Sequence, residues 1–528
     1  MSIILAFLQI NQNITFFNIS YILSLMALSK VKSLSLAGLN ALPVEVEVDI
    51  RAGLPAFTIV GLPDKAIEES KERIKSAITN SGFQFPTKKV VVNLAPAHIK
   101  KEGSWFDLPI ALGILLAGGQ LQEKSLDDFI SVGELALDGS IRFCPGVLIA
   151  ADSVKKDQNQ TIIIPLSNYF EASLVNNLEI LASDNLFELV TILRNEKIFT
   201  PPPKPTKAKE SDKNLINIED IKGQDQAKRA MVIALSGGHN ILMYGPPGTG
   251  KSLLAKTAIS LLPELEYSDA IEVTKIYSLI GNLNIEQPLV DIAPFRSPHH
   301  SSSHISLLGG GANPLPGEIT LAHRGVLFLD ELPEFTRQTL EGLRQPLEDG
   351  KVSIARAKAH LEYPAKFALI AAMNPCPCGY YGDNKRQCSC AMGNIQNYLK
   401  KISGPILDRF DIFIKLPRLS QEELLGKSEG LTSLEARKSI TQAQNIARNR
   451  QKHLNKEISI KDIEKSVELD PDGQKLLLIA LDKFNLSPRS YHKVIKIGRT
   501  IADLDNSRTI KQKHIAEALQ YRPPAEIQ

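Results

Sequence analysis

Residues whose types and spacing predict nucleotide chemistry lie in the middle of the chain. The stretch from Gly245 to Ser252 fits the pattern G-x-x-x-x-G-K-[ST], with an apolar run before it and a helical pattern after it. In that setting the loop's backbone N–H groups surround phosphates, Lys251 reaches the outer phosphates and Ser252 holds Mg²⁺. The alternative without a nucleotide-binding function is a glycine-rich turn that happens to carry Lys-Ser. The predicted nucleotide-binding residues are Gly245, Pro246, Pro247, Gly248, Thr249, Gly250, Lys251, Ser252 and Leu253.

A second apolar strand pattern, at 325–329, ends in the paired carboxylates Asp330 and Glu331. Phosphoryl transfer needs positioning and charge neutralisation rather than covalent help. Asp330 is therefore predicted to share the Mg²⁺ with Ser252, and Glu331 to polarise the attacking water. A solvated acidic turn is the alternative, but it leaves the matching phosphate loop unexplained. The two motifs together predict hydrolysis of Mg-ATP.

Four of the five cysteines form two C-x-C pairs separated by nine residues: Cys376, Cys378, Cys388 and Cys390. Four thiolates can close a structural zinc site. Because C-x-C is tighter than the usual zinc spacing, unliganded reduced thiols and an iron–sulfur cluster are kept as alternatives. This clustering does not resemble a secreted disulfide framework. We therefore expect a reducing compartment and a cytoplasmic protein.

The length of the chain predicts several domains, since 528 residues exceed what one core holds. Hydrophobic content of 43% and charged content of 23% are those of an ordinary globular protein. A formal net charge of +3 gives no support of its own for a nucleic-acid partner. We predict an α/β multidomain protein with a first domain at 26–195, a proline-rich linker at 196–214, an ATPase core at 215–418 and a helical lid at 419–528.

The first 25 residues contain no Lys, Arg, Asp or Glu. They lack the positive start and cleavage site of a signal peptide, and polar residues interrupt them too often for a spanning helix. We interpret 1–25 as a non-native upstream extension, with a membrane anchor as the alternative. No membrane partner is expected.

The first domain shows an α/β pattern in which apolar and acidic residues alternate over 44–50, as in a strand with one wet face. Further strands are predicted at 56–60, 88–94, 129–137, 161–165 and 178–182. Segments 60–64, 95–103 and 133–139 resemble the Lon-protease-like domain of certain bacterial ATPases.

In proteolytic Lon relatives a serine nucleophile follows a Lys-Asp-Gly-Pro segment. Trp105 occupies that place here, Ser104 lies one residue early, and the position of the catalytic lysine falls on Leu148. A nucleophile without a base is inactive, so we expect no peptidase chemistry and a role in interaction or assembly. A shifted site built on Ser104 is the alternative.

Motifs after the phosphate loop resemble those of AAA+ ring ATPases. Asn374 ends a third apolar strand, and the resemblance implies that it senses the γ-phosphate and orients water. Arg409 matches the arginine finger sent into a neighbouring subunit's site, where a guanidinium offsets charge on the phosphate. The C-terminal part resembles the lid of the magnesium-chelatase branch. There Arg489 fits a sensor for the nucleotide of its own subunit, with Arg499 as the competing candidate.

An insertion at 294–311 lies where this branch places a hairpin that faces the central pore. It contains His299, His300 and His304 in a loop rich in Ser and Gly. A metal site there is the alternative, but no acidic partners accompany the histidines. Contact with a translocating strand is favoured, because hydroxyl, imidazole and backbone N–H groups suit phosphate oxygens.

The domain order, with segments 295–300, 316–319 and 374–379, resembles the YifB/ComM family of magnesium-chelatase-like AAA+ ATPases over nearly all of 26–528. The resemblance implies a homohexameric helicase that uses ATP and Mg²⁺ to migrate DNA branches. It also implies branched or single-stranded DNA as a sequence-independent partner, recombination proteins as further partners, and a role in natural transformation. The alternatives are a magnesium-chelatase motor subunit and a protein-remodelling ATPase.

Overall fold

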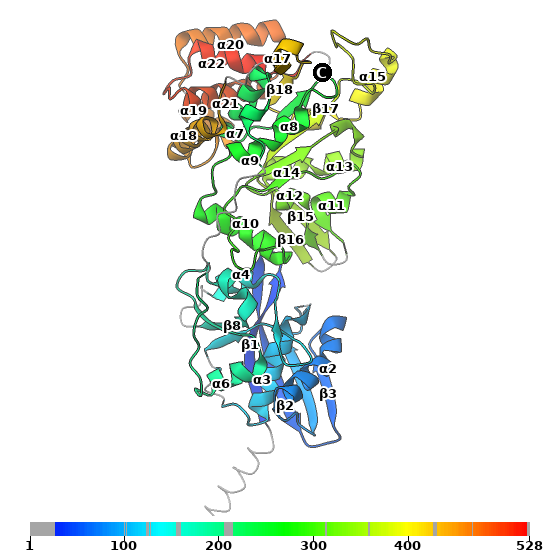
Figure 1. Ribbon diagram of the computed structural model, residues 1–528, viewed down its shortest axis with the longest axis vertical. Coiled ribbons are helices and arrows are strands. Elements are labelled where there is room, and N and C mark those ends of the chain that lie inside the picture. The colour runs from blue at the N-terminus through cyan, green and yellow to red at the C-terminus, as the bar shows by residue number, and fades with distance from the viewer. Residues whose placement is uncertain are drawn as a thin grey trace, which may run out of the picture. The chain divides into compact units, whose positions relative to one another are not determined.

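The chain forms two compact units, one comprising Met1–Ala208 with Thr274–Leu289 and the other Lys209–Val273 with Val290–Gln528. The structure, a computed structural model, describes residues 27–99, 101, 103–122, 126, 128–154, 160–204, 215–311, 314–356, 359–425, 430–466 and 468–524 (Figure 1). The predicted extension at 1–25 and linker residues 205–214 lie outside this set. Each unit has hydrophobic core clusters of its own.

The first unit is built on a seven-stranded mixed sheet in the order β3-β4-β2-β1-β5-β8-β9. Along β2 the buried positions Val44, Val46, Val48 and Ile50 alternate with less buried acidic ones, as the sequence pattern predicts. The strands are β1 (Ala27–Ala37), β2 (Asn40–Arg51), β3 (Ala56–Val60), β4 (Lys89–Ala95), β5 (Phe129–Ser131), β8 (Thr161–Pro165) and β9 (Glu179–Ser183).

The helices of this unit bury apolar residues against the sheet. Helix α3 is buried along almost its whole length. This burial is expected, because the helix carries apolar residues on all of its faces. Asp64 caps α2 by accepting a hydrogen bond from the N–H of Ile67. The main helices are α2 (Lys65–Asn80), α3 (Asp107–Ala117), α4 (Val147–Val154), α5 (Tyr169–Ala172) and α6 (Leu186–Leu193).

The strand predicted at 129–137 is wrong in its length. Strand β5 ends at Ser131, and a separate short pair follows, β6 (Glu134–Leu135) with β7 (Ile141–Arg142). At Gly133 the N–H donates to the backbone oxygen of Trp105 and the carbonyl accepts from Leu108. A Cβ at this position would lie 2.9 Å from the Leu108 side chain, so the chain turns where glycine allows close packing.

Residues Thr274–Leu289 belong to the ATPase part of the sequence but cluster with the first unit. Helix α10 (Tyr267–Leu279) ends in this segment. There Lys275 pairs with Asp152 at 2.8 Å, and Ser278 donates from Oγ to the buried carboxylate of Glu171. Glu171 also accepts from the N–H of Leu148, and burial raises its pKa. The segment is therefore held by a buried polar network.

The protease-like positions carry no catalytic pair. Trp105 and Leu148 are both buried in the core of the first unit. The Ser104 hydroxyl donates to Glu134, and among the described residues it makes no hydrogen bond to a lysine or histidine. The partner of Ser104 is thus a carboxylate, and the lack of peptidase chemistry in this domain stays a prediction.

The second unit contains a five-stranded parallel sheet in the order β11-β14-β17-β10-β18. Ile241 and Met243 of β10 face a core shared with α7 and the lid helices, whereas Leu242 faces the opposite core. This alternation places helices on both faces of the sheet. The strands are β10 (Ile241–Tyr244), β11 (Phe295–Arg296), β14 (Val326–Leu329), β17 (Ala368–Met373) and β18 (Ile412–Lys415).

Helices and two hairpins surround this sheet. The hairpins are β12 (Gly309–Gly310) with β13 (Leu315–Pro316) and β15 (Lys351–Arg356) with β16 (Ala359–Pro364). The core helices are α7 (Asp225–Gly237), α8 (Lys251–Lys256), α9 (Ala258–Leu261), α11 (His304–Leu308), α12 (Glu318–Leu321), α13 (Arg337–Gly342), α14 (Arg344–Asp349), α15 (Met392–Leu399), α16 (Gly404–Leu407) and α17 (Gln421–Leu425). The lid, which the sequence predicts to be helical, consists of α18 (Ser433–Gln451), α19 (Ile460–Ser466), α20 (Pro471–Phe484), α21 (Pro488–Leu504) and α22 (Gln512–Gln520).

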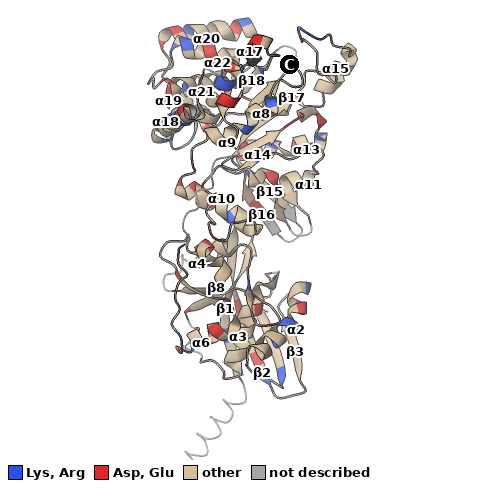
Figure 2. Ribbon diagram, viewed as in Figure 1, with Lys and Arg blue, Asp and Glu red and all other residues tan. Residues whose placement is uncertain are grey.

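Charged residues of both signs are interspersed along the elements of each unit rather than gathered on one helix or strand (Figure 2). This distribution agrees with the small net charge. Among the described residues, no helix is both long and apolar enough to cross a membrane.

We predict that Glu171→Leu destabilises the first unit by about 2 to 4 kcal/mol, because buried donors lose their acceptor. The only tryptophan of the chain, Trp105, is buried in this unit and reports its unfolding in urea by fluorescence. Glu179→Gln, an exposed change on β9, is the control and should leave the midpoint almost unchanged. Equal stability of both variants would contradict a structural role for the Glu171 network.

Candidate active site

The loop between β10 and α8 has the backbone of a phosphate cradle. Gly248 and Gly250 adopt φ of +77° and +87°, which L side chains rarely adopt. A Cβ at Gly245 would lie 2.2 Å from the backbone oxygen of Leu416. These glycines let the chain curl tightly at the carboxyl end of β10, where the loop N–H groups can meet an anion.

Lys251 is buried, and its ammonium group already donates hydrogen bonds to three oxygen atoms. Its Nζ donates to the backbone oxygens of Gly245 and Pro246, both at 2.8 Å, and to Oδ1 of Asn374 at 3.2 Å. Burial lowers the pKa of Lys251 to about 8, against the opposing effect of Asp330 and Glu331. The ammonium group thus lies where phosphate oxygens could replace carbonyl oxygens as its partners.

Ser252 and Asp330 meet as the magnesium prediction requires. The Ser252 hydroxyl donates to Oδ2 of Asp330 over 2.5 Å, and Oδ1 of Asp330 accepts from the N–H of Glu331 over 2.9 Å. Hydroxyl and carboxylate oxygens are the hard ligands that Mg²⁺ prefers, usually together with water and phosphate. The donor set therefore fits a magnesium ion bound with a nucleotide.

Strand order explains why these residues meet. Strand β17 lies between β14 and β10, and the three strands run parallel. Asp330, Asn374 and Gly245 each follow directly, or within one residue, after the carboxyl end of one of them. Parallel strands present these ends at one edge of the sheet, where ligands of open α/β folds bind.

Glu331 contacts the predicted pore insertion, which the sequence reasoning missed. Oε2 of Glu331 lies 3.3 Å from Nδ1 of His300. Strand β11 pairs with β14 so that Arg296 is opposite Leu327, and His300 and Glu331 each lie four residues further on. The contact between His300 and Glu331 could have been found only from the pairing of β11 with β14. Because β11 has only two residues, this pairing is hard to predict from sequence.

The three histidines of this insertion do not converge. The His299 and His300 rings are 4.1 Å apart, whereas His304 packs with its ring against Gly342 of α13. Among the described residues, the only cluster of three or more potential metal ligands is formed by the four cysteines. The geometry therefore favours the non-metal interpretation of the histidine loop.

Arg409 lies at the opposite edge of the sheet. It follows α16 and precedes the amino end of β18, and its backbone oxygen accepts from Nδ2 of Asn240 over 2.7 Å. Its Nη2 pairs with Glu348 of α14. Nε and Nη1 are buried with no hydrogen-bond partner among the described residues. Arg409 is therefore separated from the phosphate loop of its own chain by the length of the strands.

Arg489 lies on α21 one helical turn before Lys493. It is exposed at the start of α21, and its charge contributes to lowering the pKa of Lys493, mainly lowered by burial. Nζ of Lys493 donates to the backbone oxygen of Phe410. The role of Arg489 as a sensor for the nucleotide of its own subunit stays a prediction from the sequence. Arg499 is buried and pairs with Asp503, so it stabilises the lid.

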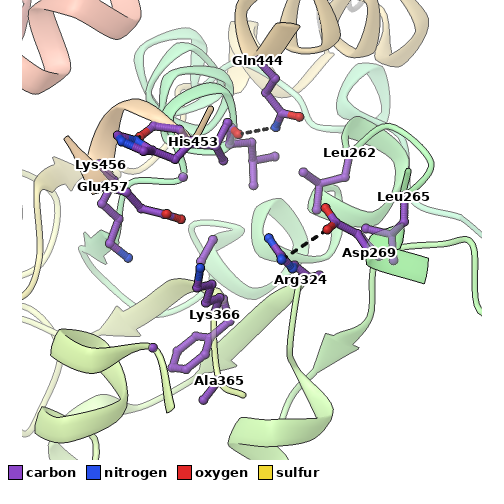
Figure 3. A pocket seen from close by; sticks show the side chains of 18 of the residues that line it. Leu262, Leu265, Asp269, Arg324, Ala365, Lys366, Gln444, His453, Lys456 and Glu457 are labelled. Atoms are coloured by element: carbon purple, nitrogen blue, oxygen red, sulfur yellow. Dashed lines mark hydrogen bonds and ion pairs between the residues drawn. The ribbon is translucent and has the colours of Figure 1, made fainter. Parts of the chain in front are cut away.

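A cavity of about 690 Å³ lies on the edge that carries Arg409. Figure 3 shows Arg324 directed at Asp269, with Lys366, His453 and Lys456 around the same space. Glu348, the partner of Arg409, is also part of its wall. None of the residues 245–252 lines this cavity, so it is distinct from the phosphate cradle.

The four predicted cysteine ligands come together. Their sulfur atoms all lie within 4.8 Å of one another. Sγ of Cys376 is 3.4 Å from that of Cys378 and 3.6 Å from that of Cys388. A tetrahedral zinc with Zn–S bonds of about 2.3 Å holds its sulfurs about 3.8 Å apart. The geometry is therefore consistent with a four-thiolate zinc site.

The cysteine loop also touches the phosphate loop. Gly379 adopts φ of +84°, and a Cβ there would lie 2.7 Å from Cδ of Pro247 and 3.8 Å from Cγ of Asn374. Its N–H donates to the backbone oxygen of Cys376. The turn that holds the first two thiols thus packs directly on the nucleotide site.

Comparison with known proteins covers most of the chain. The family described as "Magnesium chelatase, subunit ChlI" matches residues 217–424. "Subunit ChlI of Mg-chelatase" matches 46–168, and "Magnesium chelatase, subunit ChlI C-terminal" matches 430–522. These segments include part of the first unit's sheet, the nucleotide site and the lid.

Three proteins illustrate the similarity. Competence protein ComM of Haemophilus influenzae is 44% identical over 502 residues, which cover 94% of this chain and 98% of that protein. YifB of Escherichia coli is 42% identical over 499 residues, 94% of this chain and 97% of that protein. Lon protease 2 of Bacillus subtilis is 28% identical over 184 residues, 30% of this chain and 33% of that protein. With a nucleotide site of this geometry and similarity nearly from end to end, the chain belongs to the YifB/ComM family of magnesium-chelatase-like AAA+ ATPases.

Proposed function

We propose that this protein is a ring-forming motor that uses Mg-ATP to migrate branched DNA during the recombination of incoming strands. The observation that carries the proposal is the division of the hydrolysis machinery between two edges of one sheet. Lys251, Ser252, Asp330 and Asn374 gather at the carboxyl edge, while Arg409 lies at the other. A ring supplies the missing arginine from a neighbour, and we propose a homohexamer.

Each residue then has a defined task. Lys251 neutralises the outer phosphates, while Ser252 and Asp330 hold the Mg²⁺ that screens phosphate charge. Glu331 polarises the attacking water, and Asn374 orients it. Arg409 meets the phosphates of the neighbouring subunit. Arg489, at the start of α21, is proposed as the sensor for the nucleotide of its own subunit.

The loop with His299, His300 and the serines that follow supports DNA as the substrate. Hydroxyl and imidazole groups there suit phosphate oxygens without reading sequence. Because His300 contacts Glu331, a strand that engages this loop can alter the position of the catalytic carboxylate. The name of the relative ComM, a competence protein, supports the link to incoming DNA. Recombination proteins are the partners that we propose for this role.

A magnesium-chelatase motor is the second candidate, because three matched families carry that description. Stimulation of ATP hydrolysis separates the candidates. Branched or single-stranded DNA stimulates the proposed motor, a porphyrin substrate with its partner subunits stimulates a chelatase motor, and unfolded protein stimulates a remodelling ATPase.

The direct test is movement of a synthetic four-way junction. We expect the purified protein to convert the junction to its products with ATP and Mg²⁺, and to leave it intact without ATP or with Lys251→Ala. Fluorescently labelled strands separated on a gel measure the conversion. A junction that stays intact while ATP hydrolysis is normal would disprove branch migration.

Two substitutions separate ATP binding from hydrolysis. Lys251→Ala should abolish measurable binding of a fluorescent ATP analogue, because the buried ammonium is lost. Glu331→Gln should bind ATP, lower kcat about a hundredfold to ten-thousandfold and accumulate assembled rings. Glu334→Gln, which removes an exposed charge three residues away, is the matched control and should keep its turnover. Comparable turnover in Glu331→Gln would show that Glu331 is not the catalytic base.

We propose structural zinc at the four cysteines. Metal analysis should find about one zinc per chain and no iron, and Cys376→Ser with Cys388→Ser should remove it and lower the melting temperature. Cys144→Ala, at the lone cysteine of the first unit, is the control and should retain the metal. A metal-free wild-type protein with the same melting temperature as the double variant would support reduced thiols instead.

A further inference from the structure

The lid reaches the segment that carries Arg409 through lysine side chains. Lys493 on α21 donates from Nζ to the backbone oxygen of Phe410 over 2.8 Å. Lys456 donates to Oδ1 of Asn240 over 2.7 Å, and Nδ2 of Asn240 donates to the backbone oxygen of Arg409 over 2.7 Å. The carbonyls of two consecutive residues are thus held, directly or through one amide, by lid residues.

These contacts are hard to exchange for others. Burial lowers the pKa of both Lys456 and Lys493, with Asp411 as the nearby carboxylate that opposes the shift. A buried ammonium group that loses its carbonyl partner leaves an unsatisfied donor, which is more costly than losing an exposed hydrogen bond. The backbone at 409–410 therefore follows the lid when the lid moves.

The Arg409 guanidinium has hydrogen-bond donors that no described residue satisfies. Nη2 pairs with Glu348, while Nε and Nη1 have no hydrogen-bond partner among the described residues. Glu348 borders the cavity shown in Figure 3, which gives this edge an opening. A planar guanidinium with free donors suits phosphate oxygens. Apart from the pair with Glu348, the position of these donors depends on the backbone at 409–410.

Helix α21 carries an arginine, Arg489, on the same face as Lys493. Arg489 and Lys493 are four residues apart in α21 (Pro488–Leu504) and therefore lie on one face of the helix. Lys496, three residues further, donates from Nζ to the backbone oxygen of Lys456 over 2.9 Å. One face of one helix thus connects Arg489, the Arg409 segment and the second lysine contact.

We propose that Lys493 is a positioning residue that holds the Phe410 carbonyl and places Arg409 for the nucleotide of a neighbouring subunit, so that movement of α21 is transmitted to that nucleotide. This inference rests on the proposed role of Arg409. It goes further by assigning the lid residue that controls the finger and the atoms through which it acts.

The test compares Lys493→Met, which keeps the aliphatic stem without the donor, with Lys493→Arg, which keeps a donor. In Lys493→Met we expect kcat to fall about tenfold to a hundredfold, because a small misplacement of a catalytic group lowers the rate by this order. KM and the affinity for an ATP analogue should stay within about twofold of the wild-type values. Lys493→Arg should recover most of the turnover. Lys475→Met, an exposed lysine on α20, is the control and should behave as wild type.

A double-mutant comparison separates positioning from loss of structure. In an Arg409→Ala background, Lys493→Met should lower kcat no further, because the residue that it positions is absent. A further tenfold loss there, or a wild-type kcat in Lys493→Met, would overturn the inference. Ring assembly, measured by mass photometry, should be the same for all variants, and loss of rings in Lys493→Met would equally count against a positioning role.

Mixed rings test the direction of the effect. Lys251→Ala subunits cannot bind ATP but carry a normal Arg409, whereas Lys493→Met subunits bind ATP. Mixing them should raise turnover above the average of the pure variants, and no rise would contradict action on the neighbour. If Arg409→Ala alone keeps its turnover, the proposed finger and this inference fail together. If Arg409→Ala is inactive and Lys493→Met is fully active, only the inference fails.

Discussion

The common direction of five parallel strands is the constraint on which the second unit depends. The residues that follow the carboxyl ends of these strands all lie at one edge of the sheet. Gly245, Asp330 and Asn374 therefore meet there although they are far apart in sequence. The segment before β18 lies at the other edge for the same reason. A strand of four residues spans about 13 Å, too far for one arginine side chain to cover from Arg409 to the phosphate loop. Strand direction thus makes assembly part of the proposed chemistry.

Buried ammonium groups link the two edges to the rest of the fold. Lys251 at one edge and Lys456 and Lys493 at the other are all held by carbonyl or amide oxygens, and burial lowers the pKa of each. A desolvated cation keeps its charge only where oxygen atoms replace water. At the phosphate loop those oxygens can give way to a nucleotide. At the lid, Lys493 is held by the carbonyl oxygen of Phe410, and Lys456 by Oδ1 of Asn240, whose amide in turn donates to the carbonyl of Arg409. The cost of leaving these ammonium groups without oxygen partners therefore couples the Arg409 segment to the lid.

Two insertions approach the nucleotide site from different sides. The histidine loop reaches Glu331 through His300, and the cysteine turn packs Gly379 on Pro247 and beside Asn374. Through the first contact, the proposed DNA-binding loop borders Glu331, the proposed catalytic carboxylate. The second makes the shape of the phosphate loop depend on the order of the four-thiol turn. Each insertion therefore borders residues of the proposed active site that the sheet positions.

Local patterns were sufficient for much of this protein. The glycine spacing around Lys251, the alternation along β2, the apolar strands that end in Asp330 or Asn374 and the C-terminal helices all depend on neighbours within a few residues, which is why they could be predicted. Length and position were less predictable where one glycine turns the chain, as at Gly133, because the contacts that fix the turn come from Trp105 and Leu108. The pairing of His300 with Glu331 and the hydrogen bond from Lys493 to the Phe410 carbonyl could not be seen in the sequence. They depend on strand register and helix packing between segments up to 83 residues apart, which no local pattern encodes.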